Sequence, residues 1–159
     1  MKHLPKHLRP RWRYLAVSVE STPDAEIDRA TFQRQLWYAA QNLVGDAGSA
    51  DVDLSVLSFT FEAGDGEAIV RVRRGEVDRG RAIVASLAQI DDAAVGVCVR
   101  GVSGTVRACE ERYMGRALKG TNQRDVVFRD AERTAVTGVD RVDVRTDAGF
   151  TGATTLDLQ

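Results

Sequence analysis

Residues 99–113 read Val-Arg-Gly-Val-Ser-Gly-Thr-Val-Arg-Ala-Cys-Glu-Glu-Arg-Tyr and take the chain from an alternating strand, through a turn of small residues, into an amphipathic helix. The first amides of a helix have no partner within the helix, and the helix dipole adds partial positive charge there. The turn at Ser103, Gly104 and Thr105 would let a phosphate approach these amides, with Arg107 just inside the helix. The same residues would also make an ordinary helix cap, so this stretch alone leaves both interpretations open.

Working outward from that turn, apolar periodicity predicts six earlier elements. They are a strand at 14–19, a helix ending at Gly45, strands at 52–61 and 68–73, a helix from about Val77 with Ile83, Leu87 and Ile90 on one face, and a strand at 94–100. The alternation of the second strand changes phase at Val56 and Leu57, which indicates a bulge. The turn at 64–66 predicts a hairpin between the second and third strands.

The order strand, helix, strand, strand, helix, strand is typical of an α/β (α+β sandwich) fold, the ferredoxin-like or RRM-like βαββαβ arrangement. Strands one and three would lie at the centre of the sheet, both helices would cover one face, and a further helix at 106–118 would be appended. The other face would then be open, small, polar and basic. Its predicted members are Tyr14, Ala16, Ser18, Ser58, Thr60, Arg71, Arg73, Cys98 and Arg100.

A chain of 159 residues suits a single principal domain. We divide it into a basic N-terminal arm at 1–13, an RRM-like domain at 14–120 and a C-terminal tail at 121–159. The tail offers short β-like runs at 126–128 and 139–144, and residues 142–144 alternate well enough to add an edge strand. We therefore expect the tail to be partly ordered at most.

Charge is unevenly distributed along this chain, although its formal net charge is only −1. Residues 1–14 carry five basic and no acidic residues, whereas residues 15–100 carry eight basic and fourteen acidic residues. Residues 101–120 are positive again, with four basic and two acidic residues. The two basic segments flank the turn at 103–105, which favours binding of a polyanion there.

Residues suited to catalysis or metal binding are scarce. His3 and His7 both lie in the basic arm, and no Ser, Cys or carboxylate cluster suggests an oriented nucleophile and base. Cys98 and Cys109 form no CxxC pair and have no nearby His, so they indicate neither a zinc site nor a disulfide framework. We expect no catalytic residue, no metal site and no cofactor bound by this chain.

Residues 1–14 lack the apolar run of a secretory signal, and no later segment is long and apolar enough to span a bilayer. We therefore expect a cytoplasmic protein with no membrane partner.

The strand at 68–73 lacks the aromatic residues on which RNA-recognition domains stack bases, and on the first strand only Tyr14 could provide such a ring. We therefore do not expect the open face to recognise single-stranded RNA by sequence. Contacts of Arg71, Arg73 and Arg74 with the phosphates of a structured RNA are more plausible than base readout. A solvated charged face or a protein interface would explain the same arginines equally well.

Three segments together resemble one family. They are Arg-Pro-Arg-Trp-Arg-Tyr-Leu at 9–15, Ile-Val-Arg-Val at 69–72 and Val-Ser-Gly-Thr-Val-Arg-Ala-Cys-Glu-Glu at 102–111. In this order, within a ferredoxin-like frame, they resemble archaeal ribonuclease P protein component 2 over residues 8–114.

This resemblance implies a noncatalytic protein subunit of ribonuclease P, the ribonucleoprotein endonuclease that removes the 5′ leader of precursor tRNA. The RNA component and its magnesium ions would perform the chemistry. The implied partners are the ribonuclease P RNA, ribonuclease P protein component 3 and other ribonuclease P proteins, with precursor tRNA contacted indirectly. The residues that we expect to contact RNA are Arg9, Arg11, Arg13, Arg71, Arg73, Ser103, Gly104, Thr105 and Arg107.

The alternative is a ferredoxin-like protein-interaction or small-ligand module with no role in RNA processing, because this fold serves metabolite sensing and oligomerisation as often as RNA binding. Stoichiometry, self-association and the division of the surface between RNA and protein contacts do not follow from the sequence.

Overall fold

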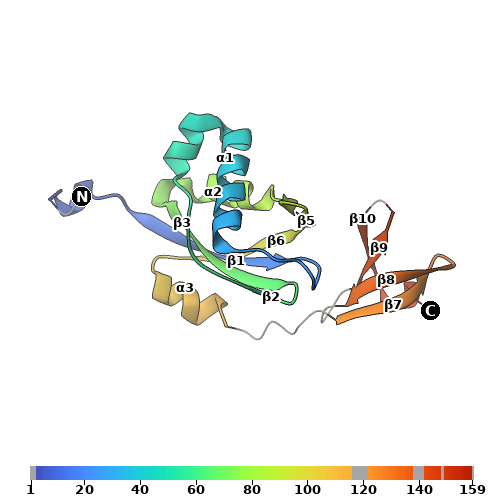
Figure 1. Cartoon of the computed structure of the whole chain (residues 1–159). Coiled ribbons are helices and arrows are strands. Elements are labelled where there is room, and N and C mark those ends of the chain that lie inside the picture. The colour runs from blue at the N-terminus through green and yellow to red at the C-terminus, as the bar shows by residue number, and fades with distance from the viewer. Residues whose placement is uncertain (1–2, 116–121, 138–141, 148, 159) are drawn as a thin grey trace.

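The computed structural model describes residues 3–115, 122–137, 142–147 and 149–158. Its main body has the predicted βαββαβ order (Figure 1). The elements are β1 (Trp12–Glu20), α1 (Arg29–Val52), β2 (Ser55–Glu62), β3 (Asp65–Arg73), α2 (Val77–Ala85), β6 (Gly96–Ser103) and the appended α3 (Val106–Tyr113), with the short pair β4 (Gln89–Ile90) and β5 (Ala93–Ala94) before β6. The antiparallel sheet has the order β2-β3-β1-β6, which confirms the ferredoxin-like fold with the first and third strands of the motif at its centre.

β1 is the central element of the sheet. It pairs with β3 from Trp12↔Arg73 to Glu20↔Asp65 without a shift in register, and on its other side with β6. Its alternate residues Leu15, Val17 and Val19 are buried against α1 and α2, as the sequence predicts. The register of this one strand therefore sets which side chains of β3 and β6 become neighbours.

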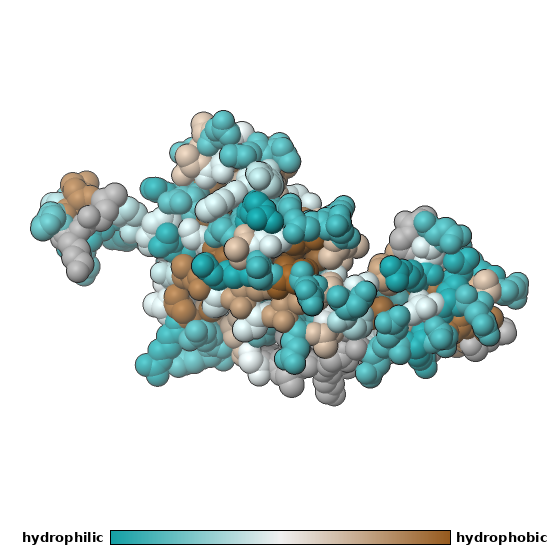
Figure 2. Space-filling model, in the orientation of Figure 1, coloured by the Kyte–Doolittle hydropathy of each residue, from teal (hydrophilic) through white to brown (hydrophobic). Residues whose placement is uncertain are grey.

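Helices α1 and α2 pack their apolar side chains on one face of the sheet. The largest fully buried side chains of this core are Phe32 and Leu36 of α1, Ile83 of α2, Ile90 of β4 and Leu15 of β1. The valines of β1 and β3 complete it. Figure 2 shows apolar residues over this body, whereas the visible part of the C-terminal segment is mostly hydrophilic.

Gly45 interrupts α1 but does not end it. Its φ of 72° and ψ of 178° lie outside the helical region, and a further helical segment continues to Val52. The left-handed φ explains the glycine, because it costs glycine little and other residues more. The prediction that the helix ends at Gly45 is thus correct for the first segment only.

Side chains from α1 hydrogen-bond to the backbone at the start of β2. Gln33 Nε2 donates to the carbonyl of Leu54 (3.3 Å), and Gln33 Oε1 accepts from the amide of Val56 (2.6 Å). Trp37 Nε1 donates to the same Leu54 carbonyl (3.0 Å), and Arg29 Nη1 donates to the Val56 carbonyl (3.0 Å). These bonds fix α1 against the outer side of β2. The predicted bulge lies just beyond them, where the β2–β3 register shifts between Val56 and Ser58.

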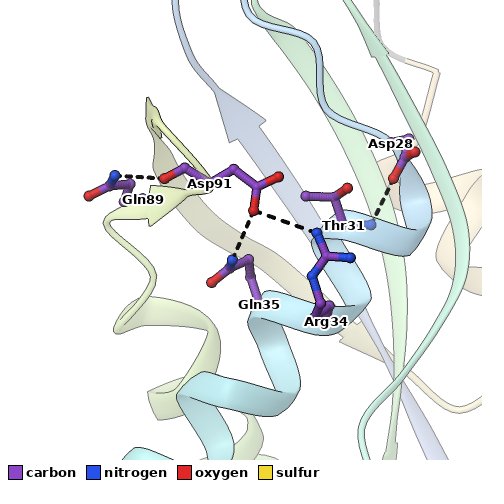
Figure 3. Close-up of polar contacts among 6 residues, drawn as sticks. All are labelled: Asp28, Thr31, Arg34, Gln35, Gln89 and Asp91. Carbon is purple, nitrogen blue, oxygen red and sulfur yellow. Dashed lines mark hydrogen bonds and ion pairs between the residues drawn. The ribbon is translucent and has the colours of Figure 1, made fainter.

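The start of α1 is tied to the β4–β5 turn (Figure 3). Asp28 caps the helix by accepting from the amide of Thr31 (2.7 Å), and hydrogen bonds from Thr31 lower the pKa of this carboxyl group. Asp91, at a left-handed φ of 47°, accepts from Gln35 (3.2 Å) and lies 3.6 Å from Arg34.

Two predicted boundaries near this turn are wrong. α2 ends at Ala85, so Leu87 and Ile90, expected on its apolar face, lie beyond it. The hydroxyl of Ser86 donates to the Ile83 carbonyl (2.7 Å), and the chain turns there. Both residues are nevertheless buried, which is why their spacing imitates a helix. The last strand runs at 96–103 rather than 94–100.

The second face of the sheet is not open as expected. α3 covers its middle, where Ala16, Ile69 and Cys109 form a buried cluster with Tyr14 and Tyr113 packed against it. A Cβ atom at Gly101 would overlap the Tyr113 ring, so the absence of a side chain there allows the helix to lie close. The expected helix at 106–118 is observed to Tyr113; residues 116–118 lie outside the described residues.

The segment that we expected to be a tail with at most partial order contains four strands. β7 (Asn122–Phe128), β8 (Ala131–Thr137), β9 (Val142–Thr146) and β10 (Gly149–Ala153) form their own antiparallel sheet in the order β10-β9-β8-β7. Its small core comprises Val126, Phe128, Ala135, Val142 and Val144. The run at 142–144 joins this sheet instead of adding an edge to the first; residues 139–141 lie outside the described residues.

Replacement of Gln33 by alanine tests the contact between α1 and β2. The Gln33→Ala variant leaves the Val56 amide without its acceptor, and we expect a loss of about 1 kcal/mol in the free energy of unfolding. Gln41→Ala, at an exposed position of the same helix, should change it by less than about 0.5 kcal/mol. Chemical denaturation measures both; equal losses would contradict the role assigned to Gln33.

Docking of α3 can be followed through Cys109, which is buried while Cys98 is exposed. Burial raises the pKa of the Cys109 thiol, and both effects slow its alkylation. In a Cys98→Ser background, Gly101→Val should accelerate Cys109 labelling roughly five- to hundredfold, because overpacking of about 1–3 kcal/mol favours the opened helix. Gly96→Val, where a Cβ meets nothing within 4 Å, is the matched control and should leave the rate unchanged.

Candidate RNA-contact site

Most of the predicted contact residues gather at one end of the sheet, where β1 begins and β3 and β6 end. We call this the basic end and define it by Arg13, Arg71, Arg73 and the turn at 103–105. Tyr14 is paired with Arg71 of β3 on one side and with Ser103 of β6 on the other. The three strands thus place segments distant in sequence in one row across the sheet.

Trp12 and two arginines form a stack at this end. The Arg71 guanidinium carbon lies 4.0 Å from the centroid of the Trp12 ring, and that of Arg73 lies 5.4 Å from it. Arg73 also forms an ion pair with Asp53 (3.4 Å). The indole therefore holds two positive groups close together, where a single anion could meet both.

The turn before α3 combines a cap with free amides. The Thr105 hydroxyl accepts from the amide of Ala108 (3.1 Å), so the capping interpretation of this residue is correct. In the described part of the chain, no hydrogen bond engages the amides of Val106 and Arg107 at the start of the helix. Capping and anion binding are therefore compatible here, because they use different amides.

Two further polar groups converge on the turn. A Cβ atom at Gly104 would lie 3.6 Å from Arg13 Nη1, so the guanidinium of Arg13 reaches the turn from β1. Ser103 is 5% exposed, and its hydroxyl oxygen has no hydrogen-bond partner among the described residues. A buried hydroxyl without a partner is costly and uncommon away from functional sites.

The remaining predicted residues lie less centrally. Arg107 is exposed and forms an ion pair with Glu111 (2.8 Å), so binding a phosphate would require it to share or exchange that partner. Arg9 donates to the Leu4 carbonyl within the arm (2.9 Å). The Arg11 carbonyl accepts from the Arg74 amide (3.0 Å), which anchors the arm to the end of β3.

The opposite end of the same sheet face is acidic. Alternation along β3 places Asp65, Glu67, Ile69, Arg71 and Arg73 on the α3 face, from acidic to basic. α3 lies over Ile69, between the two halves. Glu67 is buried, forms an ion pair with Arg100 (3.4 Å) and accepts from the Gly115 amide (3.1 Å) just past α3.

In the described ranges, no group of three His, Cys, Asp or Glu side chains is arranged to hold a metal ion. No helix of the described chain is long and apolar enough to cross a membrane.

Sequence reasoning missed Trp12, Asp53 and the role of Ser103 as a buried, unpaired hydroxyl. Trp12 lies two residues before Tyr14 on β1, so its place on the same face of the sheet could have been deduced from the sequence. Its position beside Arg71 depends on the β1–β3 register, which only the fold supplies.

Comparison with known proteins places this geometry in a family. The model of the Rpp14/Pop5 family matches residues 13–114. The chain belongs to the Rpp14/Pop5 family. The matched range begins inside β1 and ends just after α3, so the Rpp14/Pop5 domain holds the basic end, and the β7–β10 sheet lies outside it.

Several similar proteins are named ribonuclease P protein component 2. That of Natronomonas pharaonis is 63% identical over all of this chain and 99% of its own length. That of Halorubrum lacusprofundi is 61% identical over the whole of both chains. That of Methanosarcina mazei is 32% identical over 114 residues, which cover 72% of this chain and 93% of the relative.

The first two relatives thus match the Rpp14/Pop5 domain together with the C-terminal extension, whereas the third matches a length close to the domain alone. A chain in a cryo-EM structure of yeast ribonuclease MRP overlays with a TM-score of 0.47 at 19% identity, covering 61% of this chain and 76% of that one. That likeness is too weak to bear on function.

Proposed function

We propose that this chain is a protein subunit of ribonuclease P and that it binds the RNA of that enzyme through the basic end of its sheet. The observation that carries the proposal is the convergence of Arg13, Arg71, Arg73 and the turn at 103–105 in a domain of the Rpp14/Pop5 family. Arginine and helix-terminal amides are the groups that bind phosphate without reading base sequence.

The chain supports the catalytic RNA and performs no chemistry itself. The RNA and its magnesium ions cleave the 5′ leader from precursor tRNA, and this chain binds no cofactor. Its contribution is to neutralise backbone phosphates, which lets a folded RNA pack closely against protein and against itself.

Ribonuclease P protein component 3 and other protein subunits are the partners that we propose for the surfaces away from the basic end. At the opposite end of the α3 face, Asp65 and Glu67 are buried and Glu67 is paired with Arg100, so this end lacks the unpaired arginine that would attract a phosphate and suits protein contacts. The chain acts in the cytoplasm.

Reconstitution tests the proposal directly. Cleavage of precursor tRNA by ribonuclease P RNA with its other protein subunits is measured at moderate magnesium, with and without this chain. We expect a large loss of activity when the chain is omitted. Unchanged activity, with the chain shown to be folded, would overturn the proposal in favour of an interaction module.

The basic arm has a separate test in the salt dependence of RNA binding. Removal of Arg11 and Arg13 in an Arg11→Ala, Arg13→Ala variant should flatten the slope of log affinity against log salt by about 0.7–0.9 for each phosphate that the arm no longer neutralises. The control is Arg79→Ala, Arg81→Ala, which removes the same charge from exposed positions of α2. Equal slopes for the two variants would refute the role of the arm.

A further inference from the structure

Beyond the arginines themselves, we infer that Trp12 is a positioning residue, whose indole ring holds the guanidinium group of Arg71 for a phosphate of the RNA. This inference rests on the proposed function, since it states how one arginine of the basic end meets its ligand. Trp12 carries no charge, so charge alone gives no reason to assign it a part in binding a polyanion.

Arg71 differs from the other arginines on this face in the partners of its charge. Arg73 forms an ion pair with Asp53, and Arg100 forms one with Glu67. Arg71 is half-buried, yet among the described residues no carboxylate lies within ion-pair distance of it. Its Nε atom is buried and has no hydrogen-bond partner in the described structure.

A partly buried cation without an anion is unfavourable, and charged groups in such places are nearly always paired. In the free chain, the face of the Trp12 ring at 4.0 Å is the one compensating contact that the described structure gives to the Arg71 charge. An arriving phosphate would supply the missing anion. The unpaired state of Arg71 therefore indicates a ligand that is itself an anion.

Stacking and phosphate binding use different parts of the guanidinium group. The ring occupies one face of the plane, whereas N–H bonds point outward within the plane. Because Nε has no exposed surface, the two terminal nitrogens are the groups left to bind a phosphate, end-on. A flat aromatic surface fixes the orientation of this plane, which a flexible side chain on its own does not.

The register of β1 against β3 explains why Trp12, and not another ring, contacts the guanidinium group of Arg71. Tyr14 lies directly opposite Arg71, and Trp12 lies directly opposite Arg73, so Trp12 is the diagonal neighbour of Arg71 on the same face. Diagonal pairs are within reach of aromatic side chains. Tyr14 is packed against α3, which leaves Trp12 as the ring beside Arg71 beyond the cover of that helix.

Binding of the full chain to ribonuclease P RNA, measured over a series of salt concentrations, tests the inference. Trp12→Leu keeps an apolar side chain but removes the ring, and should weaken binding about two- to thirtyfold. It should also flatten the slope of log affinity against log salt by about 0.7–0.9, as we expect of Arg71→Ala, although the substitution of the tryptophan removes no charge. Trp12→Phe should restore most of the affinity and the slope.

Three controls separate positioning from folding. Tyr38→Leu removes an exposed ring from α1 and should change neither affinity nor slope. Arg71→Lys keeps the charge but removes the planar group that stacks on the ring. Its affinity for the RNA should therefore be closer to that of Arg71→Ala than to that of the parent chain. In the double variant Trp12→Leu, Arg71→Ala the effects on affinity should not add, because both substitutions act on the same phosphate.

A flattened slope for Arg71→Ala with an unchanged slope for Trp12→Leu would overturn the positioning role. Unchanged slopes for both, with a flattened slope for the arm variant, would remove Arg71 from the interface while leaving the proposed function intact. Absence of RNA binding by the parent chain, with no effect of omission on cleavage, would instead refute the proposed function itself. Thermal unfolding of each variant establishes that any change arises in the folded protein.

Discussion

The pairing of β1 with two neighbours is the constraint on which the rest of the molecule depends. Its buried residues Leu15, Val17 and Val19 allow one register, because a slip of one residue would turn all three toward the wrong face. That register aligns the end of β3 with the arm and places the end of β6 beside both. Hydrophobic burial in the middle of the sheet thereby assembles a polar surface at one end of its strands, from three segments that lie far apart in the sequence.

α3 distinguishes this chain from other domains of the same fold, because it packs on the sheet face opposite α1 and α2. In RNA-recognition domains the face opposite the helices is a stacking platform. In this chain a helix of eight residues is packed on that face, and the side chains along β3 change from acidic to basic on either side of it. The sheet interior is thus unavailable for base stacking. The side chains and amides suited to binding phosphate gather at one end of the sheet, where they predominate over groups that read bases.

Much of this architecture follows from periodicity, and the remainder depends on contacts between distant residues. Alternation and helical spacing predict the βαββαβ order, and even the bulge beside Leu57 follows from a change of phase. The packing of α3 on the second face of the sheet was not predicted, although Ile69 indicated it. An isoleucine between Glu67 and Arg71 on this face is more stable when another element buries it. The Trp12–Arg71 stack could not be predicted, because it requires the register. The β7–β10 strands were underestimated because short strands with few apolar residues give weak patterns.

The bonds from α1 to the start of β2 also bear on how this protein behaves at high concentration. An edge strand presents unpaired backbone groups on which another chain can add a strand, and such growth leads to aggregation. Gln33, Trp37 and Arg29 already occupy the carbonyls of residues 54 and 56 and the amide of residue 56. A helix thus completes part of this edge as a further strand would, without offering a new edge in turn. Self-association by strand addition is disfavoured there, which benefits a protein that must meet RNA and other proteins without recruiting copies of itself.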